Sequence, residues 1–243
     1  MNKGLIESII KKYYLSENES VKWVIKDNSL SIDFTSQNKD LIGSIKCNNV
    51  GINDCELAIF DTKKLLNLIS ICSDNLDIYP FSHKSTFNKI HIKDENYESI
   101  YHLADPILIK KPGTVNVPKW DVIFNIQNKD ILSLLKAKSA LSDSNNLLLK
   151  VESNLQTNKS NLIFHFGDEN GYNNKIMYNI PLQEKYNEIS IPFSSNLVGN
   201  ILKENKDSTS SQISIFEKGL MKMEFKIGDI ESTYYIVRLE INN

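Results

Sequence analysis

The stretch ELAIFDTKKLLNLISICSDNLDIYP, residues Glu56–Pro80, contains the unit on which the rest of the chain is built. An apolar strand around Leu57 stops at Asp61, whose carboxylate can accept from the free amides of a helix start. A helix is predicted over Thr62–Ser73 because its apolar side chains recur at helical spacing on one face, and a second strand follows it. The polar side of this helix carries Lys63.

The same strand–helix–strand pattern recurs along the chain. Further amphipathic helices are predicted at Lys3–Leu15, from Asn128 or Asp130 to about Ala140, and from Ser194 or Ser195 to about Asn205. Further strands are predicted at Val21–Lys26, Leu30–Thr35, Leu41–Cys47, Phe87–Lys93, Tyr97–Leu103, Asp121–Ile126, Leu147–Val151, Leu162–Phe166, Lys175–Leu182, Asn187–Pro192, Gln212–Phe216, Leu220–Ile227 and Ser232–Ile241. Four copies of the unit in two pairs favour an α+β fold of two similar, sandwich-like domains, each with two helices on one sheet face.

One segment interrupts this pattern. DPILIKKPGTVNVPK, Asp105–Lys119, is broken by prolines and has no stable periodicity, so it is predicted to be extended. Its apolar side chains need a surface on which to lie. We therefore predict an N-terminal domain at 1–105, a connector at 106–119 and a C-terminal domain at 120–243.

Composition narrows the function classes. The chain has 243 residues, of which 41% are hydrophobic and 24% charged, and its net charge is -2. These values are typical of a soluble globular protein and argue against a generally basic nucleic-acid binder, although basic residues can still gather on one surface. Cys47, Cys55 and Cys72 show no paired spacing, and no stretch is long and apolar enough for a membrane span. We expect reduced thiols in a cytoplasmic protein.

No catalytic or metal-binding pattern is present in the sequence. His83, His91, His102 and His165 are scattered, and Asp168-Glu169 belongs to a glycine- and asparagine-rich segment that favours a solvated hairpin loop. There is no phosphate-binding glycine loop and no nucleophile elbow. The sequence predicts no enzyme, no metal and no cofactor.

Lysines recur near the polar side of the helices: Lys11, Lys63, Lys136 and Lys203 each lie close to opposite the apolar stripe. The simpler explanation is that any amphipathic helix has a polar outer face and that Lys is common throughout this chain. The functional explanation is a weak track for the DNA backbone, which needs only modest positive density and reads no sequence.

Several longer segments are similar to one known family. LAIFDTKKLLNLISICSDN at Leu57–Asn75, ADP at Ala104–Pro106, IQNKDILSLLKAKSA at Ile126–Ala140, and Gly219–Ile241 with its strand YYIVRLE resemble the sliding clamps of T-even-type tailed bacteriophages. The resemblance covers nearly the whole chain in order. It implies the DNA-clamp fold: two domains, each of two β-α-β-β-β units, assembled as a head-to-tail homotrimeric ring.

The resemblance also implies a function. Such a ring encircles duplex DNA, without sequence specificity, and tethers the replicative DNA polymerase for processive viral replication in the host cytoplasm. A clamp-loader ATPase opens the ring, and phage clamps of this type also engage the late-transcription machinery through a sigma-like factor. The tether raises effective concentration and needs no catalytic group.

The resemblance assigns three groups of residues. The expected DNA-contacting residues are Lys3, Lys11, Lys12, Lys63, Lys64, Lys129, Lys136 and Lys203. The expected subunit-interface residues, on the edges Tyr97–Leu103 and Lys175–Leu182, are Tyr97, Ile100, Tyr101, Ile176, Tyr178 and Ile180. The expected partner-peptide site comprises Ile107, Leu108, Ile109, Val115, Val117, Tyr235 and Val237.

This chain departs from the phage pattern in two places. The first helix starts almost at once, which leaves little room for a preceding strand, and Lys138 falls near the apolar side of its helix, so it is not expected to contact DNA. Two alternatives stay open. One is a β-rich oligomeric structural or binding protein of a phage with no DNA-tethering role, and the other is a hydrolase with an unrecognised site.

Overall fold

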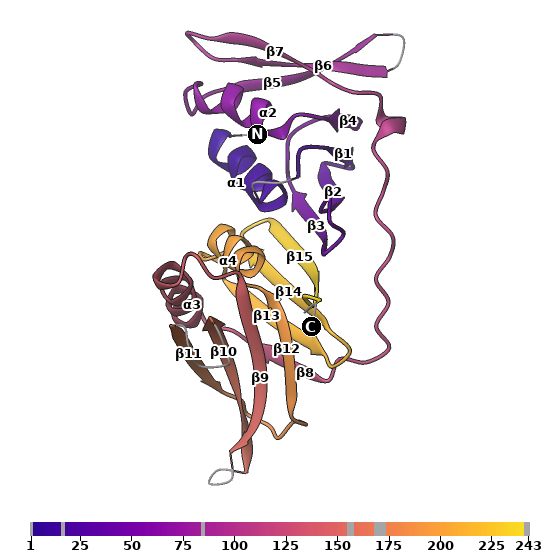
Figure 1. The fold of residues 1–243 in the computed structure, drawn as a ribbon. Coiled ribbons are helices and arrows are strands. Elements are labelled where there is room, and N and C mark those ends of the chain that lie inside the picture. The colour runs from indigo at the N-terminus through magenta and orange to yellow at the C-terminus, as the bar shows by residue number, and fades with distance from the viewer. Residues whose placement is uncertain (1, 16–17, 84–85, 155–157, 168–173, 241–243) are drawn as a thin grey trace. The chain divides into compact units, whose positions relative to one another are not determined.

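The computed structural model describes residues 2–15, 18–83, 86–154, 158–167 and 174–240 (Figure 1). The predicted loop at Asp168-Glu169, the side chain of His83, and Ile241 lie outside this description. The chain divides into two compact units. The first comprises Met1–Thr114 and Gly228–Thr233, and the second comprises Val115–Ile227 and Tyr234–Asn243.

The described residues of the first unit form two α-helices and the strands of two sheets. Its elements are α1 (Lys3–Tyr14), β1 (Val21–Lys26), β2 (Ser29–Thr35), β3 (Leu41–Asn48), β4 (Cys55–Ile59), α2 (Thr62–Ser70), β5 (Asp77–His83), β6 (Thr86–Lys93), β7 (Glu98–His102) and the 3-10 turn η1 (Pro106–Leu108). One sheet contains β4-β1-β2-β3 in that order, and the other contains β5-β6-β7. Helices α1 and α2 pack against each other, and Figure 1 shows α2 beside the β5-β6-β7 sheet.

Local chemistry explains these elements. Alternate side chains of β1 and β2 are buried, including Trp23 and Phe34, and the ring of Tyr13 from α1 packs on both. The turn between the two strands has φ of +50° at Asp27 and +60° at Asn28. Positive φ at both central positions is typical of the tight hairpin turn whose twist matches the flanking strands.

The second unit follows the same plan. Its elements are β8 (Val122–Asn125), α3 (Asn128–Ala140), β9 (Asn146–Asn154), β10 (Lys159–Gly167), β11 (Lys175–Pro181), β12 (Ile189–Ser194), α4 (Ser195–Glu204), β13 (Ser210–Phe216), β14 (Leu220–Ile227) and the second half of β15 (Ile230–Val237). The sheet orders are β11-β10-β9-β12 and β15-β14-β13-β8. The α+β class predicted from the sequence is confirmed.

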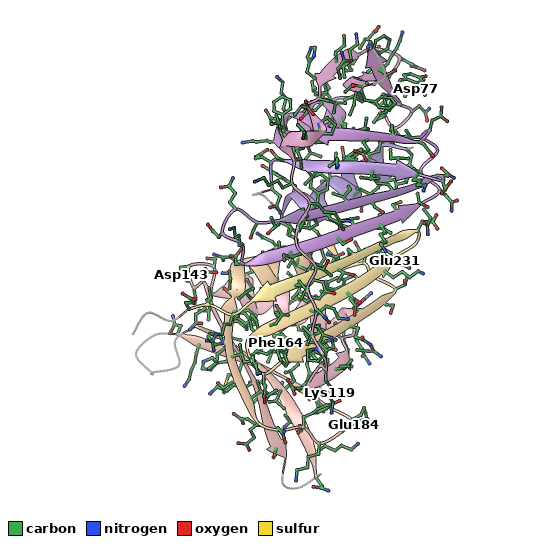
Figure 2. All side chains as sticks on the ribbon, turned by 90° about the vertical axis from the view of Figure 1, so that its right-hand side faces the viewer. Asp77, Lys119, Asp143, Phe164, Glu184 and Glu231 are labelled. Carbon is green, nitrogen blue, oxygen red and sulfur yellow. The ribbon has the colours of Figure 1, made fainter. Side chains whose placement is uncertain are left out.

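The two units differ at one sheet edge. In the second unit β13 pairs with β14 on one side and with β8 on the other. Its counterpart in the first unit, β5, pairs only with β6 among the described residues. No strand precedes α1 in the described part of the chain, as the early helix start predicted. The free edge of β5 contains Pro80 and a register shift between Phe81 and Ser82, and Figure 2 labels Asp77 at its start.

Several predicted boundaries were wrong. Helix α2 ends at Ser70 rather than Ser73, and β9 and β10 are longer than predicted. The last strand ends at Val237. Helix α3 is preceded by Gln127 as its N-cap, and Asp130 accepts from the Gln127 amide at 3.3 Å, so neither predicted capping residue holds that position.

Candidate nucleic-acid and subunit interfaces

The helices begin at capped positions and bury only one side. The Asp61 carboxylate accepts from the Lys64 amide at 2.8 Å, which confirms the predicted start of α2. The Ser194 hydroxyl accepts from Leu197 at 3.2 Å at the start of α4. Leu65 and Ile69 of α2 are buried in the core, and the opposite side of each helix carries exposed lysines.

Most of the lysines predicted to contact DNA are exposed on these helices: Lys11, Lys63, Lys64, Lys129, Lys136 and Lys203. The Lys11 ammonium lies 3.3 Å from a carboxylate oxygen of Glu7 on the same helix, which reduces its local field. Within the described ranges, the other five form no ion pair closer than 4.0 Å. Their charges are therefore available to an anionic ligand.

Two of the predicted lysines are placed differently. The Lys3 ammonium donates to the carbonyl oxygens of Ser70 (2.9 Å) and Cys72 (2.6 Å), where it neutralises the carbonyl end of α2. Lys12 is only 1% exposed. Their spacing in the sequence placed both lysines beside the polar face of α1. In the structure Lys3 bonds the end of α2 and Lys12 is buried, so we remove both from the DNA-contacting set.

Lys138 also serves a structural role. Its ammonium donates to the carbonyl oxygens of Leu141, Ser142 and Ser144, at 3.4, 3.1 and 2.7 Å. These carbonyls belong to the end of α3 and the following turn, and partial burial lowers the pKa of the Lys138 ammonium.

The predicted subunit edges are edge strands of their sheets. β7 is the last strand of β5-β6-β7, and β11 is the first of β11-β10-β9-β12. The loop after β11 contains Glu184, labelled in Figure 2. Both edges therefore carry backbone groups that lack a strand partner on one side in the described chain.

The predicted interface side chains fall into two groups. Tyr97 and Ile100 are exposed, whereas Tyr101 is 1% exposed and Ile180 8% exposed, so the last two belong to the cores of their own units. Ile176 and Tyr178 are half-buried on the helix-facing side of β11. The sequence reasoning missed Met177, which is 58% exposed on the other side.

A tyrosine on each edge strand reaches the first turn of a helix. The Tyr101 hydroxyl accepts from the amides of Phe60 and Asp61 and donates to the Asp61 carbonyl at 3.1 Å, at the start of α2. The Tyr178 hydroxyl donates to the Asp130 carboxylate at 2.7 Å, in the first turn of α3. Burial raises the pKa of Tyr101, and the bond to Asp130 raises that of Tyr178.

The connector residues predicted to bind partner peptides lie in two places. Ile107 and Leu108 are 81% and 73% exposed, and Ile109 lines a groove of about 480 Å³ over β1 and β2. In the same segment the exposed Lys111 ammonium lies 3.1 Å from a carboxylate oxygen of Asp33. In the second unit Val115 and Val117 are half-buried, Val237 is exposed, and Tyr235 stacks on Trp120, which the prediction missed.

Comparisons with known proteins address the fold. The chain matches no family model, and the curated proteins contain no match. Among solved structures, it is similar to proliferating cellular nuclear antigen (PCNA) from Entamoeba histolytica, with a TM-score of 0.71, 13% identity and coverage of 98% of this chain and 96% of that one. The fold is that of a PCNA-type sliding clamp.

Two archaeal structures agree with this fold. PCNA from A. fulgidus, solved with the C-terminal region of FEN-1, gives a TM-score of 0.74 at 11% identity over 100% of this chain and 98% of that one. PCNA from Thermococcus kodakaraensis gives 0.74 at 11% identity over 98% and 97%. The clamp fold therefore extends over the whole length.

The described residues contain no group of acidic, histidine or cysteine side chains that could hold a metal ion. Likewise, no helix among them is long and apolar enough to cross a membrane.

Proposed function

We propose that this protein is a sliding clamp that encircles duplex DNA as a homotrimeric ring and tethers a replicative DNA polymerase. The observation that carries the proposal is the set of exposed lysines on helices whose other side packs into a clamp fold. The sequence segments quoted above favour a clamp of the T-even-type tailed phages, acting in the cytoplasm of the host cell.

DNA contact in this proposal is electrostatic. Lys63, Lys64, Lys129, Lys136 and Lys203 would face phosphates, with Lys11 weakened by Glu7. Lysines that contact phosphates position a protein without reading bases, and their contribution falls steeply as salt rises. A sparse lining of this kind suits a ring that must slide.

Ring formation would use the edges of β7 and β11. They are different surfaces, so their pairing between copies is a head-to-tail contact, which closes when the rotation between copies completes a circle. Pairing would also cover two sheet edges that would otherwise remain open to unwanted strands.

Partner binding would use the connector. Ile107 and Leu108 expose large apolar side chains beside the groove that Ile109 lines. The A. fulgidus clamp was solved with the C-terminal region of FEN-1, so a protein of this fold accepts a partner segment. The proposed partners are the polymerase, a clamp-loader ATPase and a sigma-like factor of late transcription.

The clamp would act as a tether and not as an enzyme. Holding the polymerase near the primer end raises its effective concentration, so dissociation no longer ends synthesis. No chemical step by the clamp is required.

Two measurements together test the proposal. The native mass should be that of a trimer by light scattering, and the protein with its loader should lengthen the products of its polymerase on primed circular DNA. Linearising the template provides the control, because a topologically linked ring slides off a free end. A stable trimer that leaves product length unchanged on circular templates would instead support the structural-protein alternative.

A further inference from the structure

The backbone of β7 turns alternate residues towards its free edge. The Asp94 amide donates to the Tyr97 carbonyl and the Leu103 amide donates to the Asn88 carbonyl, both towards β6. In a strand the N–H and C=O of one residue point to the same side, and neighbours alternate. Glu98, Ile100 and His102 therefore direct their amides and carbonyls away from β6.

The same reasoning applies to β11. The Leu182 amide donates to the Ser160 carbonyl, towards β10. The even-numbered residues of β11 therefore direct their backbone N–H and C=O groups to β10. The residues whose backbone groups face the free edge are Lys175, Met177, Asn179 and Pro181. The first three of these carry an amide donor, and Pro181 does not.

The side chains add a second constraint. The Tyr101 hydroxyl reaches α2 and the Tyr178 hydroxyl reaches α3, so these residues mark the helix-facing sides of their sheets. Ile100 and Met177 lie on the opposite sides and are the exposed large apolar residues there, at 45% and 58%. A continuous sheet with its helices on one face must place Ile100 and Met177 on the same face.

We propose that β7 of one copy pairs antiparallel with β11 of a second copy in the register that sets Ile100 opposite Met177. This inference rests on the proposed ring and specifies its joint. The facing pairs are then Glu98–Asn179, Ile100–Met177 and His102–Lys175, each able to exchange two hydrogen bonds. On the helix side, Tyr97 faces Ile180, Ser99 faces Tyr178, and Tyr101 faces Ile176.

Neighbouring registers are poorer. Moving β11 by two residues in one direction sets Glu98 opposite Pro181, which removes a donor, and sets Ile100 against Asn179. Moving it by two in the other direction sets Ile100 against Lys175 and leaves His102 without a described partner on β11. A shift by one residue sends the helix-facing side chains to the wrong face.

Cysteine pairs test this register. The double variant Ile100→Cys with Met177→Cys places the two Cα atoms about 5.5 Å apart across the joint, within disulfide range. The comparators combine Ile100→Cys with Asn179→Cys or with Lys175→Cys, where the separation is about 7–8 Å. Each single-cysteine variant measures the crosslinking that involves the three native cysteines, which are buried.

Mild oxidation of the full-length protein followed by denaturing electrophoresis gives the readout, with native mass measured on the reduced samples. The expected result is covalent dimers and trimers from Ile100–Met177, at least about tenfold more than from either comparator. Preferential crosslinking of a comparator, or none in a chain that still assembles, overturns the register alone. A wild-type chain that stays monomeric at every concentration overturns both the register and the ring.

Discussion

β7 and β11 are both free edges, but they are anchored to their helices differently. Tyr101 of β7 is buried and makes hydrogen bonds with the backbone at Phe60 and Asp61. Tyr178 of β11 is half-buried and bonds one carboxylate oxygen of Asp130. A hydroxyl held by fixed backbone groups positions a strand more rigidly than one held by a side chain. We therefore expect β7 to be the more rigidly held edge and β11 to be the edge that can adjust.

The largest expected effect comes from blocking one edge. Ile100→Pro removes an amide that faces away from β6, so the sheet of the first unit keeps its internal bonds while the joint loses a donor and gains a bulky ring. We expect subunit affinity to fall at least about 100-fold, measured by sedimentation equilibrium.

Met177→Pro is the matched change on β11 and should have a comparable effect. The thermal unfolding of both variants serves as the folding control. If either protein assembles with unchanged affinity, its strand does not form the joint.

The next prediction concerns the two tyrosines. Tyr101→Phe leaves the Phe60 and Asp61 amides without their acceptor in a partly buried site, so we expect about 2 kcal/mol loss of unfolding free energy for the two donors together. Tyr178→Phe removes one bond to a carboxylate that still accepts from Gln127, so we expect about 1 kcal/mol or less. Chemical denaturation measures both, and equal losses would contradict the difference in rigidity.

The exposed lysines of α3 should affect DNA binding more than an exposed lysine elsewhere. Lys129→Glu with Lys136→Glu on α3 should weaken binding to duplex DNA about tenfold and flatten its salt dependence. Lys159→Glu, an exposed lysine on β10, is the control and should change neither. Fluorescence anisotropy over a salt series measures both quantities, and parallel salt slopes for all three proteins would exclude α3 as a contact.

The smallest effect is expected at β5. Alternate residues of β6 direct their backbone N–H and C=O groups to β7 and to β5. Because of this alternation, Ile78 and Pro80 of β5 have their backbone groups on the free edge, away from β6. Pro80→Val restores an amide there and should change unfolding free energy by less than about 1 kcal/mol. It should, however, increase concentration-dependent aggregation, measured by light scattering, and no increase would show that Pro80 does not guard this edge.

The sequence predicted the helices and most strands, because apolar periodicity is a local property. The edges at β7 and β11 were implied by the resemblance to phage clamps and not by periodicity. The sequence could not predict that Lys3 would neutralise the end of α2, since the two positions are far apart in the chain. The resemblance assigned Ile176, Tyr178 and Ile180 to the subunit interface. In β11 these three residues lie on the side that faces the core of their own unit, and the exposed side of the strand is the other one, where Met177 lies.

The capping of α3 illustrates a second limit. Gln127 is not among the preferred N-cap residues, so the sequence favoured Asn128 or Asp130. The burial of Lys12 also could not be predicted, because it depends on how α1 packs in the folded unit and not on the helical periodicity of the sequence.

Pro80 affects how many strand edges of each copy can pair with another copy. If β7 and β11 pair as proposed, each copy would correspond to a bifunctional monomer of the A–B type, which can lengthen into a chain or close into a cycle. An open β5 edge would add a third reactive end, and monomers with three ends branch into networks. Pro80, with the register shift beside it, would discourage pairing at the β5 edge. Among copies joined only through β7 and β11, a closed cycle is the form in which every copy has both of these edges paired.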